Sequence, residues 1–143
     1  MHSINRSVLV PFSAAQMFDL VAAVDKYPEF MPWCGGSQIL SEDEQGMRAS
    51  VTIALAGIRQ TFTTQNVHDY PNSIELSLVD GPFSSLKGRW NFIALADDAC
   101  KVEFSLTYAF SSRTLEKIVG PIFNRIASSF IDSFTKRAEA CYA

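Results

Sequence analysis

Hydrophobic and polar residues alternate with a period of two along most of the middle of the chain. Every second residue from Met47 to Leu55 is apolar, and the polar residues Arg48, Ser50 and Thr52 lie between them. The same alternation returns at 74–78, 86–92 and 102–110. This period is typical of antiparallel strands that have one buried face and one face in water. We therefore predict six strands between about residues 36 and 110.

A seventh strand is predicted at about residues 2–10, where the chain runs into Pro11. Residues that favour turns separate the later strands. These turn segments are 43–46, Gly57, 70–72, 80–82 and 97–98.

Two short helices are predicted after the first strand. Ser13 and Gln16 have the spacing of a capping box, in which each side chain bonds the backbone N–H of the other residue. Phe12 and Met17 lie where a hydrophobic staple requires them. The second short helix is predicted over 25–30, with Pro28 inside it.

A long amphipathic helix is predicted from Ser112 to the end of the chain. Its apolar positions recur at helical spacing: Leu115, Val119, Ile122, Ile126 and Phe130. The pair Gly120–Pro121 is expected to kink this helix or to split off its first turns.

This order of elements predicts an α+β fold in one domain, residues 1–143. A curved seven-stranded antiparallel sheet is expected to wrap around the C-terminal helix. A sheet that curls around a helix need not fill its interior completely.

Large rings are unusually frequent, with eleven Phe, four Tyr and two Trp in 143 residues. They line an apolar ligand cavity between sheet and helix, or they fill an ordinary core; the pattern leaves both alternatives open. The predicted lining residues are Phe30, Trp33, Phe62, Leu76, Leu78, Phe83, Trp90, Phe92, Phe104, Tyr108, Phe123, Ile126 and Phe130.

Residues 27–34 are stiffened by Pro28 and Pro32 and carry two large rings. Such a segment closes the cavity mouth as a lid, or it plugs the end of the sheet. Residues 80–83 are predicted to form a turn and a second element of the rim.

The sequence contains none of the common catalytic motifs and no cluster of metal-ligand residues. We therefore predict no catalytic residue, no metal site and no required cofactor. His68 ends a predicted strand beside Asp69 and is expected to lie at the surface or in a turn. Cys34 has no neighbouring base that would activate it.

The formal net charge is −3, which argues against DNA as a partner. Residues 113–143 are an exception, since they carry five basic and three acidic side chains. No apolar run exceeds five residues, and the first residues lack the apolar stretch of a secretory signal. We expect a cytoplasmic protein with no transmembrane segment, and transient contact with a membrane surface stays open.

Several stretches resemble the coenzyme Q-binding branch of the START-like, helix-grip superfamily, which includes RatA-type ribosome association toxins. The most specific is Tyr-Pro-Glu-Phe-Met-Pro-Trp-Cys at 27–34. The resemblance covers nearly the whole chain, and the other stretches are 10–13, 62–64, 78–83, 86–90, 120–124 and 136–138.

The resemblance implies two different functions. The first is non-enzymatic binding of ubiquinone or a similar polyisoprenoid lipid in the cavity, in support of respiration. The alternative is a RatA-type toxin that binds the large ribosomal subunit, blocks subunit association and so inhibits translation. A polyketide cyclase is a third alternative, but it requires a positioned acid or base that the sequence does not show.

Overall fold

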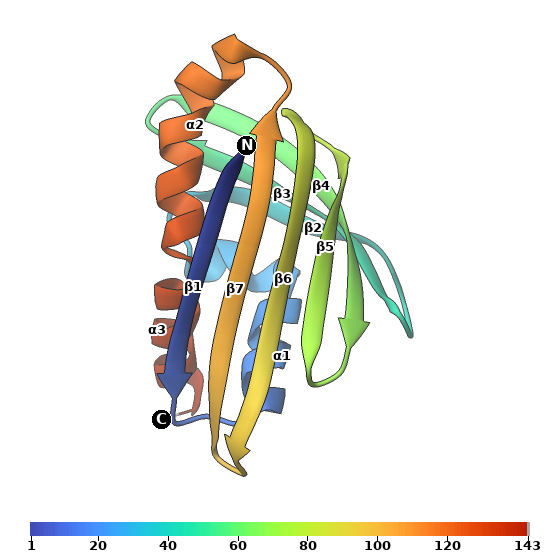
Figure 1. Cartoon of the computed structure of the whole chain (residues 1–143), viewed down its shortest axis with the longest axis vertical. Coiled ribbons are helices and arrows are strands. Elements are labelled where there is room, and N and C mark those ends of the chain that lie inside the picture. The colour runs from blue at the N-terminus through green and yellow to red at the C-terminus, as the bar shows by residue number, and fades with distance from the viewer. Residues whose placement is uncertain (143) are drawn as a thin grey trace.

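The computed structural model describes residues 1–142, which form a seven-stranded antiparallel sheet with the helices packed on one face (Figure 1). The seven predicted strands are confirmed. They are β1 (His2–Val10), β2 (Cys34–Asp43), β3 (Gly46–Leu55), β4 (Ile58–Asp69), β5 (Ser73–Asp80), β6 (Phe83–Ala96) and β7 (Ala99–Phe110).

The strand order is β1-β7-β6-β5-β4-β3-β2, so every strand except β1 lies beside its neighbour in sequence. β1 pairs with the last strand, with Val8 opposite Val102. Figure 1 shows the sheet bending strongly, so that β2, β3 and β4 cross behind the end of β6 and β7. This curvature leaves a concave face that the helices cover.

Both short helices follow β1. Helix α1 (Ala14–Ala22) begins with the predicted capping box: Gln16 N–H donates to Ser13 Oγ at 3.1 Å, and Ser13 N–H donates to Gln16 Oε1 at 2.9 Å. The second, η1 (Val24–Glu29), is a 3₁₀ helix that contains Pro28. The cap therefore fixes where the chain leaves the sheet and turns under it.

The C-terminal helical segment is divided at Ser129, and the alternative that Gly120–Pro121 splits off its first turns is wrong. Helix α2 (Arg113–Ser128) continues through Gly120–Pro121, and the break lies at Ser129, before α3 (Phe130–Tyr142). Pro121 is exposed, so the Lys117 carbonyl that loses its N–H partner can be hydrated. At the break, Ser129 Oγ donates to the Ile126 carbonyl at 2.7 Å and ends the helical hydrogen-bond pattern.

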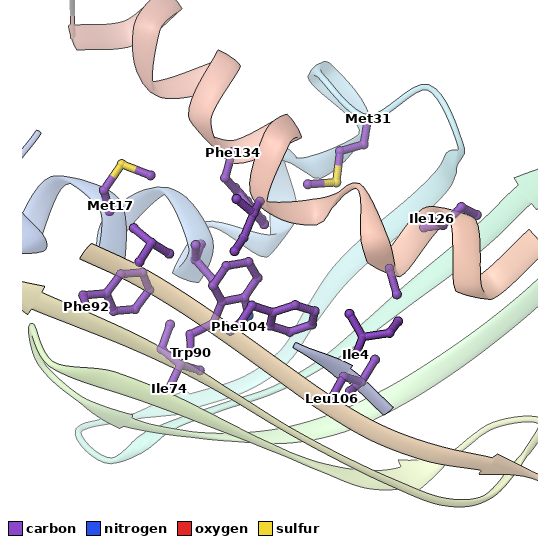
Figure 2. Close-up of a cluster of buried hydrophobic side chains, with 14 of the residues drawn as sticks. Ile4, Met17, Met31, Ile74, Trp90, Phe92, Phe104, Leu106, Ile126 and Phe134 are labelled. Carbon is purple, nitrogen blue, oxygen red and sulfur yellow. The ribbon is translucent and has the colours of Figure 1, made fainter. Parts of the chain in front are cut away.

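The core lies between the sheet and the helices. Figure 2 shows the side chains of Trp90, Phe92 and Phe104 rising from β6 and β7 toward Phe134 of α3. Trp90 is buried, as predicted, and the intervening Arg89 is exposed on the opposite face of the sheet. Within residues 1–142, no helix has both the length and the apolar character needed to cross a membrane.

Candidate functional site

At the α2 end of the core, the predicted lining residues pack against one another. The Phe123 ring centroid lies 4.9 Å from that of Phe83 and 4.8 Å from that of Tyr108. Phe62 completes this group, with its centroid 6.1 Å from that of Phe123. These four rings therefore touch one another and fill the space between sheet and helix.

A second group of rings fills the α3 end. Trp90 stacks on Phe104 with centroids 4.3 Å apart, and Phe130 lies 5.6 Å from Phe104 and from Trp33. The other predicted residues also lie in or against the core, and they are Phe30, Leu76, Leu78, Phe92 and Ile126. The structure thus places all thirteen in or against one core, and eight of them form the two aromatic groups.

A small cavity of about 60 Å³ remains between the sheet and α3. This volume is well below the roughly 300 Å³ at which pockets for drug-sized ligands begin. Three predicted residues line it: Leu76, Trp90 and Phe130. The other lining residues were not predicted from the sequence, and they are Val21, Ala22, Tyr27, Met31, Asn66, His68, Ile74 and Phe134.

His68 does not point into solvent, as the sequence led us to expect. Its imidazole packs edge-on against Phe18, with centroids 5.3 Å apart, and its Nε2 is buried without a hydrogen-bond partner. Burial lowers the pKa of His68, and the nearby Glu42 carboxylate opposes this effect. The cavity therefore has one neutral, unpartnered ring nitrogen in an otherwise mainly apolar wall. Strand alternation carried the missed signal, because Thr64, Asn66 and His68 share the inward face of β4.

Residues 27–34 are built into the end of this core. The Tyr27 hydroxyl donates to the Val21 carbonyl, and the Trp33 carbonyl accepts from Ala54 N–H at 2.8 Å. Trp33 is only 6% exposed, and its Nε1 has no hydrogen-bond partner. Burial raises the pKa of the Cys34 thiol, which disfavours the nucleophilic thiolate.

A much larger hollow of about 640 Å³ lies outside the core, between the ends of β1 and β7 and the flank of α2. We call it the outer groove. Its lining residues are His2, Tyr108, Phe110, Arg113, Glu116, Lys117, Gly120, Pro121 and Asn124. Of these, only Tyr108 was predicted as a site residue. The others were missed because the groove joins the first residues of the chain to its last third, and no sequence pattern links the two segments.

Side-chain contacts hold the wall of the outer groove together. The His2 ring stacks on Tyr108 at 5.2 Å between centroids, and its Nε2 lies 2.9 Å from Glu116 Oε1. The Tyr108 hydroxyl donates to Asn124 Oδ1 at 3.2 Å. Burial raises the pKa of Tyr108, so this hydroxyl stays protonated and remains a donor.

Within residues 1–142, no group of three or more His, Cys, Asp or Glu side chains is arranged to hold a metal ion. The three cysteines are free thiols, with Cys34 and Cys100 buried. The described residues therefore offer two candidate binding sites, the inner cavity beside His68 and the outer groove.

Comparison with known proteins gives the relatives of this chain. Residues 10–135 match the family described as "Polyketide cyclase / dehydrase and lipid transport". The chain is 49% identical over 142 residues to the "Ribosome association toxin RatA" of Vibrio cholerae, covering 99% of each chain. It is 25% identical to the "Coenzyme Q-binding protein COQ10 homolog B, mitochondrial" of Xenopus laevis, covering 96% of this chain and 58% of that protein. The resemblance inferred from the sequence is confirmed.

Solved structures confirm the fold. A START superfamily protein from Mycobacterium smegmatis matches with a TM-score of 0.78 at 20% identity, covering 98% of this chain and 99% of that one. The Zhui aromatase/cyclase from Streptomyces sp. R1128 matches with a TM-score of 0.84 at 15% identity, covering 96% and 93%. At these identities the likeness establishes the helix-grip architecture and leaves function to the site.

Proposed function

The chain belongs to the polyketide cyclase/dehydrase and lipid transport family, and within it we propose that this protein is a non-enzymatic, ribosome-associating inhibitor of translation. The observation that carries the proposal is the 49% identity over 99% of both chains to a relative named for ribosome association. The geometry supports a surface-binding function, because the large hollow lies outside the core. The protein acts in the cytoplasm, where ribosomes assemble.

The target is the large ribosomal subunit, which the family resemblance implies. Binding there prevents joining of the small subunit by occupying part of the contact surface. No bond is made or broken, so no catalytic residue is needed. Of the described residues that line the inner cavity, only His68 and Tyr27 carry acid–base groups, and the Tyr27 hydroxyl already donates to the Val21 carbonyl.

Sedimentation with purified subunits tests this function. We expect the protein to move with the large subunit in a sucrose gradient and to reduce the fraction of joined ribosomes when subunits are mixed. Overexpression should slow growth in proportion to that loss. An unrelated acidic protein of similar size is the control. A protein that stays at the top of the gradient at low salt, and leaves growth unchanged, would contradict the proposal.

A second candidate function is binding of ubiquinone or a similar isoprenoid in the inner cavity. The favouring observation is the unpartnered Nε2 of His68, a buried polar atom of a residue that lines the mainly apolar cavity. An imidazole N–H there can donate to a quinone carbonyl. The cavity of about 60 Å³ must widen first, and the break at Ser129 is a place where α3 can move away from the sheet.

Fluorescence quenching by added ubiquinone tests this second candidate. Trp90 lines the cavity, so Trp90→Phe should remove part of the quenching, whereas Arg89→Ala on the outer face should not. His68→Gln should weaken binding of ubiquinone but not of squalene, an isoprenoid hydrocarbon without carbonyls. Equal quenching in all variants, or none in the unmodified protein, would reject the inner cavity as a quinone site.

A further inference from the structure

The outer groove has a basic rim. Arg113 and Lys117 stand one turn apart on α2, both are exposed, and neither forms an ion pair within residues 1–142. Glu116 is the one acidic side chain in the groove, and it contacts His2 at 2.9 Å. The rim therefore presents two cations whose charge no carboxylate of the described chain neutralises.

The acidic residues that dilute the basic tail in sequence lie elsewhere in space. Asp132 and Glu139 belong to α3, beyond the break at Ser129, and neither lines the groove. Residues 13–112 carry six basic and twelve acidic side chains, whereas residues 113–143 carry five basic and three acidic. An anionic partner is therefore attracted to the helical end of the molecule and repelled by the rest.

The floor of the groove is aromatic and partly uncovered. Phe110 is half-buried there, and the His2 ring, stacked on Tyr108, is exposed. Gly120 lies beside Phe110, and a Cβ added at this glycine would stand 3.6 Å from Phe110 Cε2. The missing side chain thus leaves one edge of the Phe110 ring open to the groove. A planar group can lie on these rings while its charge meets Arg113 or Lys117.

A single-stranded RNA segment has this combination of chemistry. Its phosphates pair with Lys and Arg, and its unstacked bases stack on aromatic rings regardless of sequence. We propose that the outer groove binds a single-stranded segment of ribosomal RNA, with Arg113 and Lys117 on phosphates and a base on the His2–Phe110 floor. This inference rests on the proposed ribosome association and names the surface and the partner chemistry that carry it.

Charge reversal with a matched control tests the groove. Arg113→Glu/Lys117→Glu removes both rim cations. Arg48→Glu/Lys87→Glu makes the same change of charge on the outer face of the sheet, where both residues are exposed and neither pairs with a carboxylate. Each protein is titrated against a fluorescein-labelled 12-nucleotide RNA over a range of salt, and against purified large subunits by sedimentation. Circular dichroism checks that each variant is folded.

The groove variant should bind the oligonucleotide and the large subunit at least tenfold more weakly than the control variant. Its slope of log affinity against log salt should fall by about 1.4, because each phosphate contact contributes about 0.7 on a single strand. Gly120→Leu fills the groove without changing charge, so it should weaken binding and leave the salt slope of the remaining affinity unchanged.

Three results would overturn the inference. If wild-type protein sediments with the subunit and both double variants bind equally, the ribosome is contacted by another surface and the proposed function stands. If only subunit binding is lost, and ultraviolet cross-linking at 254 nm yields no nucleotide adduct on peptides containing His2 or Phe110, the groove contacts a ribosomal protein. If the oligonucleotide binds alike in all variants, the groove is not an RNA site. Failure of wild type to sediment, with groove-specific oligonucleotide binding intact, overturns the proposed function and leaves the RNA site.

Discussion

The inner cavity and the outer groove lie on the same sheet but on different strands, and they are opposite kinds of site. Strands β4, β5 and β6 line the cavity, whereas β1 and β7 line the groove. The cavity has about 60 Å³, is bounded by packed rings and contains one unpartnered imidazole nitrogen. The groove has about 640 Å³, is open and combines rings with charged groups. Tyr108 links the core to the groove. Its ring packs in the core, and its hydroxyl faces the groove. Aromatic richness alone therefore does not say whether a concave sheet holds a ligand or closes on itself.

Enlarging the cavity should give the greatest change. Phe134→Ala removes a buried ring from the cavity wall and should destabilise the protein by about 4 kcal/mol, measured by urea unfolding. The vacated space joins the existing cavity, so the variant should bind benzene.

Phe123→Ala is the matched control, because it removes an equally buried ring that does not line the cavity. Its destabilisation should be similar, and its benzene affinity should be lower than that of Phe134→Ala. Equal benzene binding by both variants would show that the cavity is not distinct from the rest of the core.

Removing one hydroxyl from the groove wall should have a smaller effect. Tyr108→Phe deletes the hydrogen bond to Asn124 Oδ1, and we expect a loss of about 1 kcal/mol in unfolding free energy. Because the ring stays in place, affinity for the RNA oligonucleotide should change by less than about twofold, well below the tenfold loss expected for Arg113→Glu/Lys117→Glu. A double-mutant cycle of Tyr108→Phe with Asn124→Ala isolates the energy of this hydrogen bond. A coupling energy of zero would contradict the prediction.

The smallest effect is a pH dependence from the cavity wall. The pKa of His68 is lower in the folded protein than in the unfolded chain, so the unfolded state binds more protons between these two values. Stability should therefore fall as pH is lowered below about 6.5, the ordinary histidine pKa.

In His68→Gln this part of the pH dependence should disappear. Glu42→Gln should increase the loss of stability at low pH, because the Glu42 carboxylate partly offsets the effect of burial on the His68 pKa. Thermal unfolding between pH 7.5 and 5.5 measures all three proteins. Parallel curves for wild type and His68→Gln would show that the imidazole is solvated in the folded state.

Local patterns predicted the fold well because their causes are local. Strand alternation in four segments, together with the turn residues and Pro11, predicted the seven strands, and the Ser13–Gln16 spacing predicted the first helix cap. The alternative of a split at Gly120–Pro121 was wrong, because Pro121 lies on the exposed side of α2. Water can hydrate the Lys117 carbonyl that lacks an N–H partner there, so the helix continues through Pro121. The break at Ser129 depends on a serine bonding the carbonyl three residues earlier, which many helices tolerate.

The sites were harder to predict for a different reason. Alternation along β4 places His68 inward, but its position beside a turn suggested exposure. The outer groove needs His2 beside Tyr108, and only the pairing of β1 with β7 brings these residues together. No pattern within either segment carries that information.

The pairing of β1 with β7 also sets the order in which the protein is completed during its own synthesis. β1 is made first, yet its partner strand ends at Phe110, and α2 follows at Arg113–Ser128. Until those residues have emerged, the first strand has no neighbour and the groove has no second wall. A nascent chain that still lacks α2 therefore cannot present the groove, so the proposed binding of ribosomal RNA requires a chain that has folded beyond this point.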